Sequence, residues 1–171
     1  NSSTTACGRS VPTSSASVSD GGAGGVAPAT VPAGAKDVLP VEAQELRAIE
    51  RAWRSCVEGC GYREVMTPVL EFAGVVDRAQ EGVAGEAFRL FDEAGRVMVL
   101  RPDLTIPVAR LIATRMADHP GPVRVSYLAS AFRPPRPGRP RATEQRQAGV
   151  ELVGATEPGA DAEVIALLVR S

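Results

Sequence analysis

Residues 123–154 read VRVSYLASAFRPPRPGRPRATEQRQAGVELVG, and this stretch decides the fold. Two apolar, strand-like arms, Val123–Phe132 and Gln145–Val153, flank a loop of Pro, Arg and Gly, which predicts a hairpin with a cationic tip. Six arginines lie along it: Arg124, Arg133, Arg136, Arg139, Arg141 and Arg146. A guanidinium group presents a planar fork of donors, so the tip suits a phosphate or a carboxylate. A solvated, polyproline-like loop on an ordinary sheet is the alternative interpretation.

The composition limits the possible classes of function. The chain has 171 residues, 44% of them hydrophobic, with a net charge of −1 and only 4% aromatic residues. This balance argues against wholesale binding of membranes or nucleic acid. No apolar run approaches the roughly 20 residues that span a bilayer. Three cysteines do not form a disulfide framework in a chain of this size, so a cytoplasmic setting is expected.

The chain divides into a tail and one domain. Residues 1–33 contain no Leu, Ile, Met or aromatic residue, which predicts a disordered low-complexity tail. Residues 34–171 are predicted to form the N-terminal part of a larger domain. The sequence begins with Asn1 rather than Met and stops at Ser171 within a helical pattern, so we interpret it as a fragment without its C-terminal part.

Hydrophobic periodicity predicts four helices, over residues 41–58, 72–79, 105–116 and 158–170. In the last helix, Leu167 and Leu168 are expected to face inward. The buried stripe of the first helix is predicted to consist of Leu46, Ile49, Trp53, Cys56 and Val57. Cys56 and Cys60 are four residues apart, but no nearby Cys or His completes a metal site, so both are interpreted as core thiols.

Short apolar runs predict the strands. Residues 62–68 and 69–71 read as extended segments, and residues 88–91 and 97–100 as a hairpin closed by Asp92–Gly95, with Gly95 at positive φ. Hairpin strands with helices gathered to one side predict an α+β fold with an antiparallel sheet.

Several segments resemble one family. Gly61–Glu71 (GYREVMTPVLE) resembles motif 1 of the class II aminoacyl-tRNA synthetases, and Phe132-Arg133 with its basic loop and return strand resembles motif 2. LRPDLT (Leu100–Thr105), followed by Phe132-Arg133 and by QAGVELVG (Gln147–Gly154), is similar to the histidyl-tRNA synthetase branch. The resemblance implies a class II synthetase-like antiparallel sheet flanked by helices, present here as a partial domain.

The resemblance also implies a histidine-binding site. Asp103, Thr105 and Gln147 match the positions that hold the α-amino group of histidine, and an ammonium group favours such acceptors. Glu151 matches the glutamate that faces the imidazole N–H. Arg133 matches the motif 2 arginine that steadies the amino-acid carboxylate and the ATP α-phosphate.

From the residues alone, simpler roles stay open for these positions. Asp103 could cap the helix that begins near Thr105, a role that Asp often fills. Gln147 and Glu151 could be solvent-facing strand residues.

Two positions depart from the synthetase pattern. Pro135 stands where the synthetase has the glutamate that reads the adenine edge, and Gln145 where it has the phenylalanine on which adenine stacks. Proline cannot accept those hydrogen bonds and glutamine has no aromatic face, so adenine loses both anchors. The histidine half of the pocket is kept and the ATP half is eroded.

This combination favours one of two branch members. The first is histidyl-tRNA synthetase itself. The second is a paralogue without catalytic residues or cofactor, the regulatory subunit required by short-form ATP phosphoribosyltransferase in the first step of histidine biosynthesis. We interpret the chain as the second kind, with the synthetase as the alternative. The resemblance implies histidine as ligand, the transferase catalytic subunit as partner and self-association through motif 1.

Overall fold

The computed structural model describes residues 31–135 and 142–170. Of the tail expected over residues 1–33, residues 1–30 lie outside this range. The elements follow one another as α1 (Pro40–Gly59), β1 (Arg63–Glu64), β2 (Leu70–Phe72), α2 (Ala73–Ala79), the 3-10 helix η1 (Val83–Glu86), β3 (Arg89–Phe91), β4 (Val97–Leu100), α3 (Thr105–Arg115), β5 (Val123–Phe132), β6 (Glu144–Val153) and α4 (Pro158–Arg170). The predicted α+β class is confirmed.

The central element is the β5–β6 hairpin predicted from the opening stretch. Its ten residue pairs run antiparallel from Val123 opposite Val153 to Phe132 opposite Glu144. On the far side of β5, the short β1 pairs in parallel, so the sheet order is β1-β5-β6 and the sheet is mixed. The strand predicted over residues 62–68 is reduced to Arg63–Glu64, although the Val65 N–H still donates to the Ser126 carbonyl at 2.9 Å. Beyond it, the Thr67 carbonyl accepts from the Arg101 guanidinium instead of from a strand.

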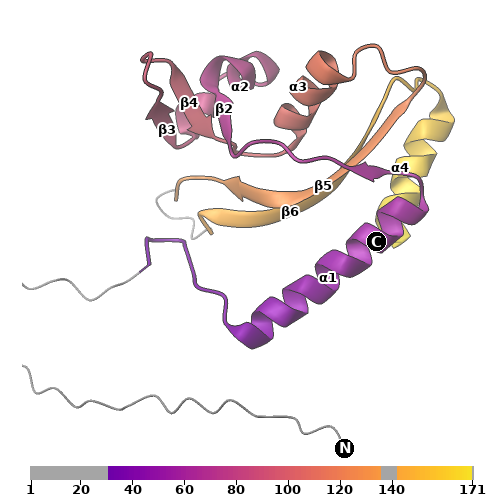
Figure 1. Ribbon diagram of the computed structural model, residues 1–171, viewed down its shortest axis with the longest axis horizontal. Helices are drawn as coiled ribbons and strands as arrows, with labels where there is room; N and C mark the ends of the chain where they lie inside the picture. Colours follow the sequence, from indigo (N-terminus) through magenta and orange to yellow (C-terminus); the bar gives the residue numbers. More distant parts are fainter. Residues whose placement is uncertain (1–30, 136–141, 171) are drawn as a thin grey trace, which may run out of the picture. The chain divides into compact units, whose positions relative to one another are not determined.

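The two faces of this sheet are covered by different helices (Figure 1). Side chains alternate along a strand, so the odd-numbered residues of β5 and β6 share one face. On that face α3 packs against β5 and forms the main core cluster with it. The cluster consists of Leu104, Val108, Ile112, Val123, Val125, Tyr127 and Ala131. On the opposite face lie α1 and α4. Val57 of α1, Leu167 of α4 and Tyr62, which follows α1, form a buried cluster, and Val150 of β6 packs against it.

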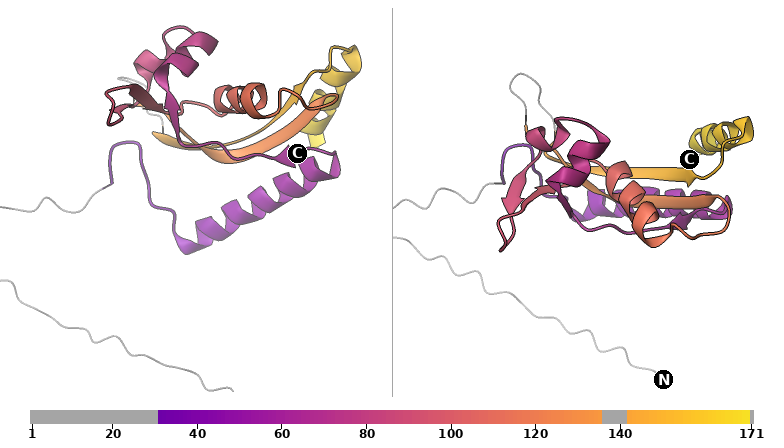
Figure 2. Two further views of the ribbon diagram at one scale, coloured as in Figure 1. Left: turned by 45° about the horizontal axis from the view of Figure 1, so that its top comes forward. Right: turned by 90° about the horizontal axis from the view of Figure 1, so that it is seen from above.

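A second sheet stands at the end of the hairpin opposite α4 (Figure 2). Its antiparallel strands are ordered β2-β4-β3 and are covered by α2, with Val76, Ala87 and Val99 as the buried cluster. The predicted β3–β4 hairpin is confirmed, and Gly95 has the expected positive φ of 76°. In this turn the Asp92 carboxylate accepts hydrogen bonds from the N–H groups of Ala94 and Arg96.

Arg101 joins the two sheets. Its buried guanidinium donates to the Ser130 carbonyl of β5 at 2.8 Å and to the Thr67 carbonyl at 2.7 Å. Its backbone donates to the Val69 carbonyl and accepts from Phe132 N–H, both at 2.9 Å. Arg101, directly after β4, therefore places the start of α3 beside the end of β5.

The helix α4 is tied to the sheet by one carboxylate. Glu163 accepts two hydrogen bonds from Arg124, at 2.7 and 2.8 Å, and one from the Tyr62 hydroxyl at 2.9 Å. These bonds lower the pKa of Glu163 to about 2. Burial, followed by the bond to Glu163, raises the pKa of Tyr62 to about 12.

Three predicted core positions were wrong. Ile49 of α1 is 66% exposed, and the inward position beside it is taken by Glu50, which is 8% exposed. Leu168 of α4 is exposed, whereas Leu167 is buried. Cys60 is exposed because it ends α1 at the turn, so only Cys56 packs near a core cluster. At Ile49 and Leu168, the apolar side chain stands directly beside the residue that faces inward, so the buried face was placed one residue away from its true position.

Candidate ligand-binding site

Three side-chain oxygens meet on the face of the hairpin that α3 covers. The Tyr127 hydroxyl of β5 donates to the Glu151 carboxylate of β6 at 3.4 Å and lies 3.3 Å from the Thr105 hydroxyl at the start of α3. A phenol carries one proton, so the bond to Thr105 then uses the Thr105 proton. Both distances exceed the usual O–H···O distance of about 2.7–2.8 Å. The oxygens of this cluster therefore keep capacity for further hydrogen bonds.

Gly149 makes room for the tyrosine. It stands opposite Tyr127 in the strand register, and a Cβ atom at this position would lie 2.3 Å from the Tyr127 hydroxyl oxygen. Only glycine therefore lets the buried ring lie across β6. Burial raises the pKa of the Tyr127 phenol, and the nearby negative charges of Glu151 and Asp103 raise it further, against a lowering by the bond to Thr105. The phenol stays a neutral donor.

Gln147 shares this face with Glu151. Gln147 is opposite Ala129 and Glu151 is opposite Val125, so both point to the side of α3 and are half-buried. Two residues of β6 that the sequence analysis proposed as ligand contacts are thus on the same face as Thr105 and Tyr127.

Asp103 caps α3, as one of the two interpretations held. Its Oδ1 accepts the N–H of Ile106 at 3.0 Å, which satisfies a donor of the first helical turn. Capping occupies one of its two carboxylate oxygens. Since its charge also acts on the Tyr127 phenol, Asp103 lies at the edge of the same cluster.

Arg133 is bound to the backbone just before Asp103. Its Nε donates to the Pro102 carbonyl at 2.8 Å, and its backbone N–H donates to the Thr143 carbonyl, also at 2.8 Å. The arginine is half-buried at the end of β5. It therefore joins the base of the basic loop to the segment that enters α3.

The carboxylates of this face have no arginine partner in the part of the chain that the structure describes. Within residues 31–135 and 142–170, neither Asp103 nor Glu151 takes part in an ion pair. Their recorded partners are a backbone N–H and a phenol. Two negative charges beside hydroxyl and amide oxygens form a surface suited to a cationic, hydrogen-bond-donating ligand.

Tyr127 was missed by the sequence analysis, although a signal was present. Val123, Val125 and Tyr127 alternate along β5, which places the tyrosine on the buried face. A buried tyrosine hydroxyl needs a polar partner, and glycine opposite it permits close approach. Together these features would have pointed to Glu151 on the paired strand.

The part of the chain that the structure describes lacks two further features. No group of three or more His, Cys, Asp or Glu side chains there could hold a metal ion. No helix in those residues is long and apolar enough to cross a bilayer.

A family model described as histidyl-tRNA synthetase matches residues 34–171. The chain belongs to the histidyl-tRNA synthetase family. Its fold is accordingly that of a class II synthetase-like partial domain, as predicted. In solved structures it is similar to an ATP phosphoribosyltransferase regulatory subunit/histidyl-tRNA synthetase from Bacillus halodurans, with 34% identity, a TM-score of 0.72 and coverage of 83% of this chain and 37% of that one. A Staphylococcus aureus histidyl-tRNA synthetase gives 29% identity and a TM-score of 0.70, covering 82% and 33%.

Curated relatives within the family carry two names. The ATP phosphoribosyltransferase regulatory subunit of Moorella thermoacetica is 43% identical, over 84% of this chain and 37% of the relative. The subunit of Symbiobacterium thermophilum is 46% identical, over 80% and 35%. A histidine–tRNA ligase of Methanosarcina acetivorans is 39% identical, over 80% and 33%. The chain spans about a third of the length of these relatives.

The two departures from the synthetase pattern of this family lie beside the cluster. Gln145 is opposite Ala131 and so lies on the face of Gln147, at the end of β6 near the basic loop. Pro135 is exposed, two residues after Arg133. An amide and a pyrrolidine ring thus stand where the resemblance implies a stacking ring and an adenine-reading carboxylate.

Proposed function

We propose that the full-length protein is a non-catalytic regulatory subunit of ATP phosphoribosyltransferase that binds histidine and is required for activity of the short-form transferase. The names of the relatives from Moorella and Symbiobacterium support the regulatory role in histidine biosynthesis. The proposal for the ligand rests on one observation: the carboxylates of Asp103 and Glu151 are free of ion pairs among the described residues and flank the hydroxyls of Thr105 and Tyr127.

Histidine has the groups that this surface would recognise. Its ammonium group would donate to Asp103, Thr105 and Gln147, and its imidazole N–H to Glu151. Arg133 would face its carboxylate, since a guanidinium group favours that anion. Tyr127 would hold one oxygen of Glu151, so that the other oxygen is presented to the ligand.

The adenine base of ATP would lose its two contacts, although Arg133 stands at the position that faces the α-phosphate. With Gln145 in place of an aromatic ring and Pro135 in place of a carboxylate, adenine loses both its stacking partner and its edge reader. Stacking on an aromatic ring contributes about 1–3 kcal/mol per base. Histidine would be bound without being activated.

The assay that tests this function is histidine-dependent ATP–pyrophosphate exchange by the full-length protein, run beside transferase assays with the short-form catalytic subunit. We expect no exchange, and transferase activity only when both proteins are present. Restoring the two adenine contacts with Gln145→Phe and Pro135→Glu is not expected to create exchange. Robust exchange by the parent protein would refute the proposal.

Robust exchange would instead favour the second candidate function, histidine–tRNA ligase. The Methanosarcina relative carries that name, and its 39% identity to this chain supports ligase activity as the second candidate function. It requires that ATP bind without the two adenine contacts discussed above.

Self-association through motif 1, Gly61–Glu71, is part of the proposal. Met66 in this segment is 83% exposed, although it directly follows Val65, which packs against the main core cluster. A large apolar side chain so exposed beside a buried one suits a contact with a second copy, in which each chain would present the same surface.

A further inference from the structure

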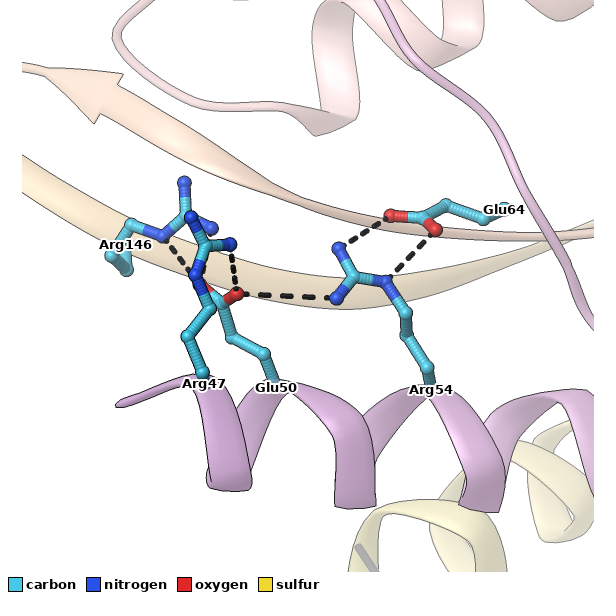
Figure 3. Close-up of polar contacts among 5 residues, drawn as sticks. All are labelled: Arg47, Glu50, Arg54, Glu64 and Arg146. Atoms are coloured by element: carbon cyan, nitrogen blue, oxygen red, sulfur yellow. Dashed lines mark hydrogen bonds and ion pairs between the residues drawn. The ribbon is translucent and has the colours of Figure 1, made fainter. Parts of the chain in front are cut away.

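An alternating chain of charges connects α1 to both outer strands of the central sheet (Figure 3). Glu50 of α1 accepts from Arg146 of β6, with Nε at 3.0 Å, and from Arg47 at 3.0 Å. One turn further along α1, Arg54 lies 3.9 Å from Glu50 and donates twice to Glu64 of β1, at 3.0 and 3.2 Å. The strands β1 and β6 are thereby held by one helix.

Glu50 is the buried centre of this chain. It is 8% exposed, in a position where the helix would otherwise present an apolar side chain. Burial by itself would raise the pKa of the Glu50 carboxyl, but the hydrogen bonds and charges of Arg146 and Arg47 outweigh it and hold that pKa below its usual value. The carboxylate stays charged, and its arginine partners must stay in place to compensate for its burial.

The side chain of Arg146 is held by its ion pair with Glu50 and not by close packing. A cavity of about 480 Å³ adjoins its side chain, lined in part by Lys36, Arg47 and Glu144. The side chain of Arg146 is 45% exposed, so it has room to move away once Glu50 loses its charge.

Arg146 lies on the face of β6 opposite to the candidate ligand site. Successive side chains of a strand point to opposite faces, so Arg146 points to α1 while its neighbour Gln147 points to the site. Among the described residues, β5 is the only strand that pairs with β6. At this position, the Arg146–Glu50 pair is therefore the second support of the strand that carries Gln147 and Glu151.

We propose that Glu50, acting through Arg146, is a positioning residue for the histidine site. This rests on the proposed function. Displacing α1 would move Arg146 and, with it, the backbone of Gln147.

The test uses Glu50→Gln, Arg146→Gln and the double variant of the full-length protein. Histidine affinity is measured by calorimetry at a temperature at which circular dichroism shows all variants folded. We expect each single variant to bind histidine about three- to tenfold more weakly, and the double variant to bind no more weakly than either, because one interaction is removed in all three. Hydrogen exchange without histidine should be faster at Gln147–Glu151 in each variant.

Glu71→Gln is the matched control. Glu71 is also buried, and its carboxylate accepts from Arg110 at 2.6 Å, but the pair joins β2 to α3. This variant should lose stability while keeping its histidine affinity and the exchange rates of β6. If Glu50→Gln binds histidine like the parent protein, or if its loss is matched by Glu71→Gln, the proposal is overturned. A parent that binds no histidine refutes the proposed function instead, and the exchange rates then decide alone whether Glu50 positions β6.

Discussion

The carboxylates on the two faces of the β5–β6 hairpin have different hydrogen-bond partners. On the face of α1 and α4, Glu50 and Glu163 each accept two or more bonds from arginine, and the pKa of each is held low. On the face of α3, the partners of Glu151 and Asp103 are a phenol and a backbone N–H. Among the described residues, the hairpin is therefore flanked by carboxylates paired with arginine on one side and by carboxylates without an arginine partner on the other.

This contrast separates structural from functional carboxylates. A buried carboxylate that only holds helices needs a permanent cationic partner, because burial without one is costly. A carboxylate that binds a cationic ligand has to lack such a partner in the ligand-free protein. Within residues 31–135 and 142–170, Glu151 and Asp103 meet that condition, whereas Glu50 and Glu163 do not.

The largest effect is expected where a charge is forced into the α3 face. Val65 packs against the main core cluster, so Val65→Asp buries a carboxylate without a partner and should lower the free energy of unfolding by about 3 kcal/mol. Met66→Asp, on the exposed neighbour, should leave folding intact and weaken self-association. Urea unfolding and sedimentation of the full-length variants separate the two effects. If both variants fold and assemble normally, motif 1 is not an interface.

A smaller effect is expected from closing the space beneath the tyrosine. In Gly149→Ala the new methyl group overlaps the Tyr127 hydroxyl, so the ring must move and stability should fall by about 2 kcal/mol. Thr105 and Glu151 would lose their shared partner, and histidine binding should weaken with it. Gly159→Ala in α4 is the control, since nothing lies within 4 Å of a Cβ there. Equal stability of the two variants would show that Tyr127 is not held across β6.

Removing the imidazole acceptor should affect binding and leave the fold unchanged. Glu151→Ala is expected to weaken histidine binding by about 1–2 kcal/mol, because an imidazole N–H would remain unpaired in the site. Glu144→Ala, seven residues earlier on β6 and on the other face, should bind as the parent does. Calorimetry on both variants provides the comparison, and unchanged affinity in Glu151→Ala would remove this residue from the site.

The hairpin, the helices and the family were predictable from the sequence, because apolar periodicity and the segments Leu100–Thr105 and Gln147–Gly154 are local signals. The buried Glu50 was not, since a glutamate on a helix is ordinarily assigned to the surface and its arginine partner is 96 residues away. Assigning Ile49 to the core was the counterpart of that error. Tyr127 lay between the motifs that carried the resemblance, and its role depends on a cross-strand register that local patterns do not fix.

The smallest expected effect is on stability at acidic pH and concerns Glu163. The pKa of Glu163 lies at about 2, below its usual 4.5, so its bonds to Arg124 and Tyr62 stabilise the fold above about pH 4.5, and this contribution is lost as the pH falls towards 2. In Glu163→Gln the loss of stability between pH 4.5 and 2 should be shallower than in the parent protein. Urea unfolding across this range measures the difference. Parallel pH profiles would show that the carboxylate is not compensated as described.

The contrast between the two faces is tested most directly by titrating the full-length protein with histidine in a calorimeter. If the carboxylates of the α3 face are kept free for a cationic ligand, histidine should bind saturably at one site per chain, without ATP. Absence of any binding heat at millimolar histidine, from a protein shown to be folded, would contradict the assignment of Asp103 and Glu151 to a ligand site.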